Sequence, residues 1–297
     1  MPGKQFSKVL YEKELIIDTH VHLTPPFIIN KFAYYRQREP YFDLLCSSPV
    51  NKNVTGEQLI KHLDQTGVGR AVVFGFAFSD NQLCCRVNDY IIAQVNKYPD
   101  RLMGFAVVNP RSEEAIKELR RCKNAGLKGI GELLPSGQNF TITAKKDLTA
   151  ICDFARENRW PILVHFNESV GHYYPGKTAD SLPEAIKLAH NFPEVTFIYA
   201  HLGGGLCFYE LMPEVKETLR NVYYDTAAVP YLYQSQIYDT LQAAGISGKI
   251  IMGSDYPLLS PGKYLAQIKR SNLNVEEKTA ILGRTFEKIM VGEGRGN

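Results

Sequence analysis

The strongest constraint on the fold is a repeated alternation of short apolar runs with longer amphipathic segments. The runs are rich in β-branched or aromatic residues and span 14–18, 70–76, 101–108, 126–133, 161–166, 195–200, 221–225 and 249–255. The segments between them repeat apolar residues mostly at three and four, which is helical spacing, and span 55–67, 88–99, 112–126, 147–159, 181–193, 209–221, 235–245 and 275–290. Because the runs are apolar throughout, we expect parallel strands covered by helices. The sequence predicts an α/β fold, a (β/α)8 TIM-like barrel, with an open doubly wound sheet as the alternative.

The chain has no Pro/Gly/Ser-rich linker and no abrupt change of composition, so we expect a single domain over residues 1–297. One stretch does not fit a simple barrel. Residues 23–54 form an aromatic and proline-rich insertion after the first strand, where a few residues would suffice. Loops of that length are usually functional, and this one is expected to be a lid or binding element.

Composition narrows the function classes. With 44% hydrophobic and 22% charged residues, the chain can build an ordinary core. The net charge of +3 comes from dispersed lysines and arginines, so no nucleic-acid partner is expected. The start of the chain has no secretory-signal pattern, there is no long apolar stretch, and the six cysteines form no C-x-x-C pair. We therefore expect a cytoplasmic protein with reduced thiols and no membrane association. Its expected partners are a small-molecule substrate and further copies of the same chain, in a homodimer or a higher homo-oligomer.

The ionisable residues fall at the carboxyl ends of the expected strands. The six candidates are His20, His22, Glu132, His165, His201 and Asp255. In a (β/α)8 barrel these strand ends converge on one face, where catalytic residues gather. Side chains distant in sequence are thus expected to meet around one axis.

These residue types at this spacing predict a metal site. His20 and His22 share one side of an extended segment, so both imidazoles can approach one ion. Each candidate alone has an ordinary explanation: chance spacing, a surface ion pair for Glu132, a hydrogen-bonded core for His165 or His201, a turn cap for Asp255. Together they favour a catalytic site for one or two divalent ions, with zinc first and manganese, iron or nickel as alternatives. His62 and His190 lie in helical segments and are expected to be surface or packing residues.

The octapeptide GHYYPGKT at 171–178 fits the phosphate-loop pattern G-x-x-x-x-G-K-[ST]. A phosphate loop must leave a strand at its first glycine and enter a helix at Lys-Thr. Here the strand is expected to end near His165 and the next helix to start only at Asp180 or Ser181, while Pro175 removes a backbone donor. The sequence around the pattern therefore disfavours an NTPase.

The same octapeptide follows the fifth strand directly, which makes it a candidate substrate loop. Its predicted substrate-binding residues are His172, Tyr174 and Lys177. Lys177 would favour an anionic group on the substrate, and a solvated loop lysine is the alternative.

Six segments carry a resemblance to a known family. In order they are IIDTHVHL, GELLP, LVHFNES, YAHLGGG, YYDTA and IMGSDYP. The set resembles the amidohydrolase superfamily, specifically its amidohydrolase-related branch of metal-dependent hydrolases and decarboxylases. The resemblance implies a distorted barrel in which His20, His22, His165, His201 and Asp255 surround one or two divalent metals. Two positions depart from it: Glu132 replaces the bridging lysine of many members, as in TatD-type nucleases, and Thr285 replaces an asparagine near the C-terminus.

The resemblance implies two main activities. The first is hydrolysis of a C–N or C–O bond in a small amide, lactone or ester, in which a metal-activated water attacks, Asp255 moves the proton, and His201 ligates or stabilises the oxyanion. The alternative is non-oxidative decarboxylation of a small aromatic or unsaturated acid, with one metal held by His20, His22, His165 and Asp255 and with His201 left for acid/base work. A TatD-like nuclease and a purely structural metal protein are weaker alternatives.

Overall fold

The computed structural model describes residues 16–48, 52–178 and 182–292. Its strands form two parallel sheets. The first contains β1 (Ile17–His22), β2 (Arg70–Phe74) and β3 (Leu102–Gly104) in that order. The second contains β4 (Ile130–Leu133), β5 (Ile162–Val164), β6 (Phe197–Tyr199), β7 (Val222–Asp225) and β8 (Ile250–Ile251) in that order. The described strands lie within the eight expected runs, except that β1 continues to His22.

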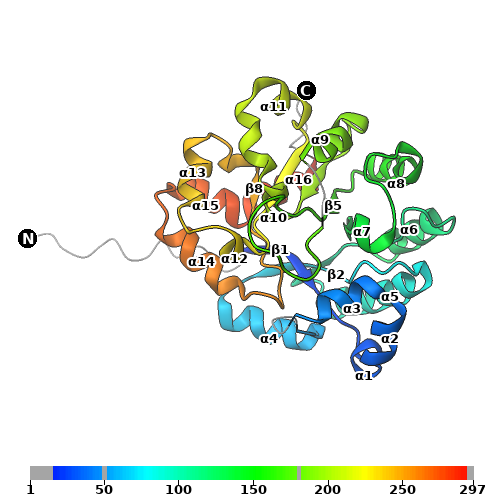
Figure 1. The fold of residues 1–297 in the computed structure, drawn as a ribbon. Helices are drawn as coiled ribbons and strands as arrows, with labels where there is room; N and C mark the ends of the chain where they lie inside the picture. Colours follow the sequence, from blue (N-terminus) through cyan, green and yellow to red (C-terminus); the bar gives the residue numbers. More distant parts are fainter. Residues whose placement is uncertain (1–15, 49–51, 179–181, 293–297) are drawn as a thin grey trace, which may run out of the picture.

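The edges of the two sheets meet through isolated parallel bridges. Ala106, just after β3, pairs with Ile130 of β4, and Val21 of β1 pairs with Tyr256 after β8. At the second junction the Thr19 amide also donates to the Met252 carbonyl at 2.9 Å. The helices surround the strands in Figure 1. The predicted TIM-like barrel is confirmed.

Helices alternate with the strands around the barrel. The larger ones are α4 (Gly56–Thr66), α5 (Asn81–Lys97), α6 (Ala115–Asn124), α8 (Lys145–Asn158), α9 (Leu182–Asn191), α13 (Ile237–Ala243) and α14 (Pro261–Arg270). Local sequence explains their ends. Thr55 and Gln58 form a capping box at the start of α4, and Gly67 ends that helix in a left-handed conformation at φ 77°.

Three helical segments differ from the expectation. The helix expected at 88–99 already begins at Asn81, capped by Asp80. The one expected at 209–221 divides into a 3-10 turn (Leu206–Leu211) and α11 (Pro213–Thr218), because proline cannot continue a preceding helix. Helix α14 was not predicted, although its buried Tyr264 and Ile268 lie at helical spacing.

The C-terminal helical segment is also interrupted. Residues 275–290 form α15 (Val275–Thr279), a π segment (Ala280–Arg284) and α16 (Thr285–Val291), with Gly283 outside helical geometry. Shorter helices follow several strands: α7 (Pro135–Gln138), α10 (His201–Gly204), α12 (Val229–Leu232) and a 3-10 turn (Ser247–Lys249).

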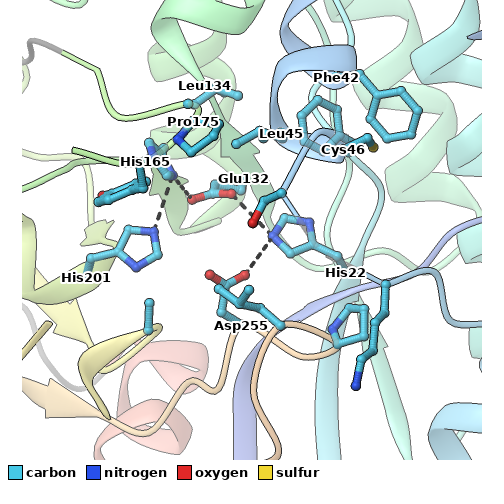
Figure 2. Close-up of a pocket in the computed structure, with 18 of the residues that line it drawn as sticks. His22, Phe42, Leu45, Cys46, Glu132, Leu134, His165, Pro175, His201 and Asp255 are labelled. Carbon is cyan, nitrogen blue, oxygen red and sulfur yellow. Dashed lines mark hydrogen bonds and ion pairs between the residues drawn. The ribbon is translucent and has the colours of Figure 1, made fainter. Parts of the chain in front are cut away.

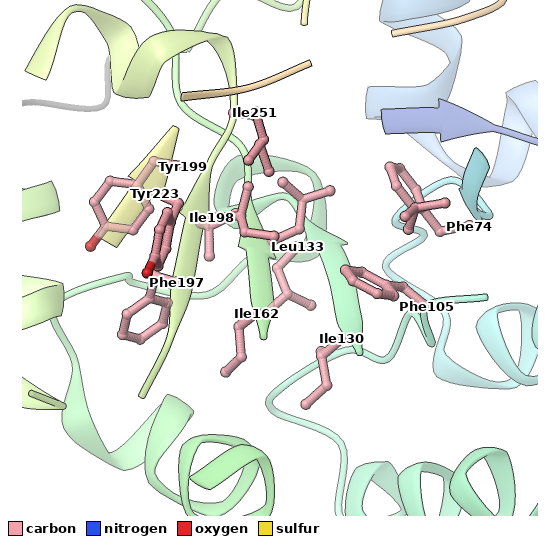
Figure 3. Close-up of a cluster of buried hydrophobic side chains, with 14 of the residues drawn as sticks. Phe74, Phe105, Ile130, Leu133, Ile162, Phe197, Ile198, Tyr199, Tyr223 and Ile251 are labelled. Atoms are coloured by element: carbon pink, nitrogen blue, oxygen red, sulfur yellow. The ribbon is translucent and has the colours of Figure 1, made fainter. Parts of the chain in front are cut away.

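The barrel interior and the helix faces against it are apolar. Figure 3 shows side chains from successive strands packed together, including Phe74, Ile130, Ile162 and Ile198, all at most 1% exposed. Dense packing of this kind holds the strand ends in fixed relative positions. All six cysteines are free, and no helix in the described residues is long and apolar enough to cross a membrane.

The insertion after β1 folds into three short helices, α1 (Pro26–Asn30), α2 (Phe32–Arg38) and α3 (Pro40–Cys46). Residues 49–51 of the expected 23–54 insertion lie outside the described residues. The buried Glu39 carboxylate fixes α3 to the segment after β2, since it accepts hydrogen bonds from Ser79 N and Oγ and from Asp80 N at 2.8–3.0 Å. The insertion is thus anchored beside the barrel mouth.

Candidate metal centre and active site

The six predicted ligand candidates meet at the C-terminal face of the barrel. His20 and His22 lie on β1, Glu132 on β4, His165 directly after β5, His201 at the start of α10, and Asp255 after β8. Figure 2 shows the labelled imidazoles and carboxylates converging at the bottom of one pocket. The possible metal ligands form two groups, His20–His22–Asp255 and Glu132–His165–His201.

Three of these side chains, His20, His22 and Asp255, place one ligand atom each around one point, and Glu132 Oε2 lies beside both histidines; these four residues are called the cage. His20 Nε2 lies 3.2 Å from His22 Nε2, and each of these nitrogens lies 3.5–3.7 Å from Glu132 Oε2 and 3.4–3.7 Å from Asp255 Oδ1. Ligand atoms about 2.0–2.2 Å from one tetrahedral ion lie about 3.3–3.6 Å apart. The spacing of His20, His22 and Asp255 is close to these values and fits a single divalent ion, and Glu132 lies near two of the three. Zinc and manganese accept nitrogen and carboxylate ligands of this kind.

Asp225, at the end of β7, fixes the orientation of His20. Its Oδ2 lies 2.7 Å from His20 Nδ1, and its Oδ1 accepts from the backbone N–H groups of His201 and Ala227 at 3.0 and 2.9 Å. A carboxylate only accepts, so His20 donates from Nδ1 and keeps the lone pair of Nε2 for an ion. Asp225 is missing from the predicted site, although it ends an apolar strand run in the same way as the chosen residues.

The carboxylates make this site strongly attractive to positive charge. Burial opposes ionisation of Glu132, but His165 and His20 outweigh it and lower the pKa of Glu132 to about 2. Burial likewise opposes ionisation of Asp255, yet His22 and His20 hold its pKa below the ordinary value. Burial would lower the pKa of His20, whereas Asp225, Glu132 and Asp255 together raise it to about 10. Such a cluster is the electrostatic environment of a cation site.

The second group shares Glu132 with the first. Glu132 Oε1 lies 2.9 Å from His165 Nδ1, which is 3.3 Å from His201 Nε2. The other nitrogen of His165 lies 3.0 Å from Asn167 Nδ2, and His201 Nδ1 lies 2.8 Å from the Ala227 carbonyl oxygen. Glu132 thus faces the cage with one oxygen and the histidine pair with the other.

Two site residues adopt the left-handed backbone conformation. His201 has φ 56° and Asp255 has φ 59°, values that non-glycine residues rarely take and that occur often at functional sites. Position 204, three residues after His201, requires glycine. A Cβ on Gly204 would lie 2.3 Å from the Asn167 carbonyl oxygen, so the loops after β5 and β6 approach too closely for any side chain there.

Above the cage lies a cavity of about 480 Å³. Its walls are mostly apolar or aromatic, and its polar residues lie at the ligand cluster and around the insertion, where Lys52 and Asn53 line it. Lining residues include Phe42, Leu45, Phe76, Leu134, Tyr174, Pro175, Leu232 and Leu258. The size and lining suit a small organic molecule with one apolar face. Helix α3 supplies one wall, and Lys52 is the lysine that lines the cavity in the described part of the chain.

The 171–178 loop forms another wall of the cavity. His172 and Tyr174 line it, and the Tyr174 hydroxyl lies 2.6 Å from Asn167 Oδ1. Lys177 is not among the lining residues, and its Nζ donates to the carbonyl oxygens of Val170 and His172 at 2.6 and 3.2 Å. A substrate role for these three residues stays a prediction.

The phosphate-loop geometry is absent from the described part of this loop. Strand β5 ends at Val164, residues 171–178 form no helix, and α9 is described from Leu182. The caps expected at Asp180 and Ser181 lie outside the described residues. His62 stacks on Tyr256 at a centroid distance of 4.3 Å, and His190 is exposed on α9, so neither belongs to the ligand groups.

The barrel and its convergent histidines and carboxylates define an enzyme-type (β/α)8 fold with a candidate metal centre. The chain belongs to the amidohydrolase family, whose family model, described as Amidohydrolase, matches residues 17–289. The resemblance found in the sequence is thereby confirmed. No curated protein matches the chain.

Solved structures share the fold at low sequence identity. A structure assigned as an amidohydrolase from Staphylococcus aureus is 20% identical with a TM-score of 0.70, covering 93% of this chain and 99% of the other. The 5-carboxyvanillate decarboxylase of Sphingomonas paucimobilis is 15% identical with a TM-score of 0.74, covering 93% and 98%. A manganese-bound dihydroxybenzoic acid decarboxylase from Polaromonas sp. JS666 is 15% identical with a TM-score of 0.67, covering 95% and 98%.

Proposed function

We propose that this protein is a metal-dependent, non-oxidative decarboxylase of a small aromatic carboxylic acid. The observation that carries the proposal is the cage, in which the ligand atoms of His20, His22 and Asp255 fit one ion, at the bottom of an apolar cavity with His201 beside it. The decarboxylases of similar fold, which act on 5-carboxyvanillate and dihydroxybenzoate, support this choice over the hydrolysis favoured by the sequence.

His20, His22, Glu132 and Asp255 would hold one divalent ion, either zinc or manganese. Manganese is present in three of the related decarboxylase structures, and the oxygen and nitrogen ligands suit both metals. When bound, the ion supplies a positive charge that orients an oxygen of the substrate or acidifies a water molecule. The apolar walls formed by Phe42, Phe76 and the neighbouring leucines would receive the aromatic ring.

His201 is the proposed proton donor. Its Nδ1 donates to the Ala227 carbonyl, which leaves Nε2 directed toward His165 and the ligand cluster. A proton on Nε2 passes to the ring carbon that carries the carboxylate. The bond to the carboxylate carbon then breaks, carbon dioxide leaves, and the bonding pair stays on the ring and restores aromaticity. Solvent returns the proton to His201, and Asp255 assists that transfer.

Helices α1–α3 and the 171–178 loop, which surround the cavity, have proposed roles in substrate binding. Helices α1–α3 act as the lid, because α3 contributes Phe42, Leu45 and Cys46 to the cavity wall. His172 and Tyr174 contact the substrate from the opposite loop. Lys177 keeps its predicted preference for an anionic group only if the loop rearranges, since its Nζ donates to carbonyl oxygens of its own loop.

The proposal is tested with purified protein loaded with manganese or zinc and a panel of hydroxybenzoates, amides, lactones and esters. We expect carbon dioxide and the matching phenol from one of the acids. His201→Asn should lower kcat at least 100-fold with metal content unchanged, whereas the matched control His190→Asn on α9 should leave turnover intact. Ester, lactone or amide hydrolysis without carbon dioxide release from any acid would overturn the proposal.

Hydrolysis is the second candidate, and one observation favours it. Glu132 lies between the two ligand groups, with Oε2 toward His20 and His22 and Oε1 toward His165. A carboxylate so placed can bridge two ions. In this reaction Asp255 takes the proton of the attacking water and passes it to the leaving group. Two tightly bound ions per chain, together with ester, lactone or amide turnover, would support this candidate.

A further inference from the structure

The Asp18 side chain joins the first and last strands of the barrel next to the cage. Asp18 lies on β1, two residues before His20, and is fully buried. Its Oδ1 accepts hydrogen bonds from the backbone N–H of Ser254 at 2.8 Å and from that of His20 at 3.3 Å. Its Oδ2 lies 2.5 Å from the Ser254 hydroxyl. One carboxylate thus connects the strand that carries His20 with the segment that carries Asp255.

This carboxylate replaces one bond in the backbone pairing between β1 and the segment after β8. The Thr19 N–H donates to the Met252 carbonyl at 2.9 Å. In an evenly spaced parallel pair, the Ser254 N–H would donate back to the Thr19 carbonyl. It donates to the buried carboxylate instead, and the next backbone bond, from Asp255 to the His20 carbonyl at 2.9 Å, comes one residue later on both segments. The pairing is therefore irregular at the residue before Asp255.

Further hydrogen bonds hold the residues on either side of Asp255. The Ser254 hydroxyl accepts from the Tyr256 N–H at 3.1 Å, and the Ser254 carbonyl accepts from the Tyr264 hydroxyl of α14 at 2.8 Å. Asp255 itself has a left-handed φ of 59°, a conformation that a non-glycine residue keeps only where its surroundings fix it. The bonds to Ser254 provide such surroundings, and Asp18 contributes two of them.

The backbone conformation of Asp255 decides where its carboxylate lies. Its Oδ1 lies 3.4 Å from His22 Nε2 and 3.7 Å from His20 Nε2, and Figure 2 shows Asp255 directed toward His22. Asp18 is not among the residues that line the cavity. It can therefore act on the cage only through the ligand residues whose backbone it holds.

We propose that Asp18 is a positioning residue that sets the backbone of Asp255 and thereby places the Asp255 carboxylate in the cage. The backbone N–H groups that Asp18 accepts, rather than its negative charge, carry this role. The inference rests on the metal site of the proposed function and identifies the side chain that assembles this site where the first and last strands meet.

The first measurement is manganese affinity by competition with a chelator, on variants whose folding is checked by circular dichroism. Asp18→Ala should weaken binding about 10- to 100-fold, the usual effect of losing a group that orients a ligand. Asp18→Asn keeps an oxygen for both backbone N–H groups and should bind within about fivefold of the wild type. An Asp18→Ala affinity within threefold of the wild type, or an equal loss in both variants, would overturn the proposal.

The matched control is Glu118→Gln on α6. Glu118 is also a buried carboxylate that accepts several hydrogen bonds, but it belongs to neither ligand group. The substitution should lower folding stability and leave manganese affinity unchanged. A loss of affinity as large as that of Asp18→Ala would show a general effect of destabilisation and refute the assigned role.

The second measurement is a crystal structure of metal-free Asp18→Ala. We expect residue 255 to leave the left-handed conformation and its carboxylate to move away from His22. An unchanged φ with Oδ1 still beside His22 would overturn the proposal. If Asp18→Ala fails to fold, Ser254→Ala serves in both measurements, because it removes the hydroxyl that lies between Asp18 and the Tyr256 N–H. Wild-type affinity in that variant would refute the role of Asp18.

These experiments separate the two proposals. A wild-type protein that binds manganese but releases no carbon dioxide would refute the proposed function, while the affinities and the crystal structure would still test Asp18. An active decarboxylase whose manganese affinity is the same with and without the Asp18 carboxylate would refute only the role of Asp18.

Discussion

Replacing Asp225 with asparagine is the sharpest single test of the cage. Asp225 is fully buried, and its Oδ1 accepts two backbone N–H groups, from His201 and Ala227. The asparagine oxygen must take that position, because an amide NH2 there would face two donors. The NH2 group therefore falls at the Oδ2 position, 2.7 Å from His20 Nδ1.

Two donors at that distance cannot coexist without cost, since an unpaired buried donor costs about 1–3 kcal/mol. His20 escapes the clash by moving its hydrogen to Nε2, and that atom then has no lone pair for the ion. Loss of a hydrogen-bond partner of this kind lowers metal affinity about 10- to 100-fold. This corresponds to about 1.4–2.8 kcal/mol of binding free energy.

The assay is competition for manganese or zinc against a chelator of known affinity, with folding checked by circular dichroism. The control is Asp153→Asn, the same substitution on the exposed side of α8, where the acid pairs with Arg156. It should bind metal like the wild type. A folded Asp225→Asn protein whose affinity lies within threefold of the wild type would refute the assigned role of Asp225.

Three further predictions concern the cage, the cavity wall and the loss of folding stability in acid. His20→Ala combined with His22→Ala should abolish stoichiometric metal binding while the barrel remains folded, measured by metal content and circular dichroism; retained metal would contradict the cage. Gly176→Ala should destabilise the protein and raise KM, because its Cβ would lie 2.1 Å from Leu45 Cδ2 of α3. The control Gly171→Ala shares the φ of 90° but meets no atom closer than 3.9 Å, so an equal effect of both would rule out the α3 contact. Burial disfavours ionised Glu118, but hydrogen bonds from Arg121, Asn88 and Cys122 hold its pKa below the ordinary 4.5. The ionised carboxylate therefore stabilises the folded protein above pH 4.5, and this stabilisation is lost as the pH falls through the lowered pKa. Glu118→Gln should cost about 1–3 kcal/mol at neutral pH and less in acid, and a pH-independent difference in urea unfolding would contradict this.

The sequence was most informative where a polar residue ends an apolar run. His165, His201 and Glu132 stand out as a set because several apolar runs end in an ionisable group, and the barrel brings strand ends together. Asp225 gives the same signal at the end of the seventh run, but a lone aspartate there also reads as an ordinary turn residue. Its function appears only when its contacts with His20 and His201 are seen.

Residues whose role depends on contacts between loops could not be predicted. Lys177 attracted attention through its place in a motif, yet it lies outside the cavity lining, whereas Lys52 lines the cavity. Whether a lysine reaches the cavity depends on how the loops fold around it, and no local sequence pattern predicts that. Asn167 similarly meets Tyr174 and His165 only because the folded loop brings them into hydrogen-bonding distance.

The charge of the site links the cage to the proposed reaction. Glu132 and Asp255 together would neutralise one bound divalent ion, and buried Asp225 adds a further negative charge beside His20. A carboxylate substrate would then approach a site of net negative charge. A proton on His201 offsets that charge, so the acid binds most favourably to the form of the enzyme that holds this proton. The same proton is consumed when carbon dioxide leaves, so the charge that admits the substrate is also the reactant that the decarboxylation requires. A neutral amide or lactone would gain no such advantage from a proton on His201.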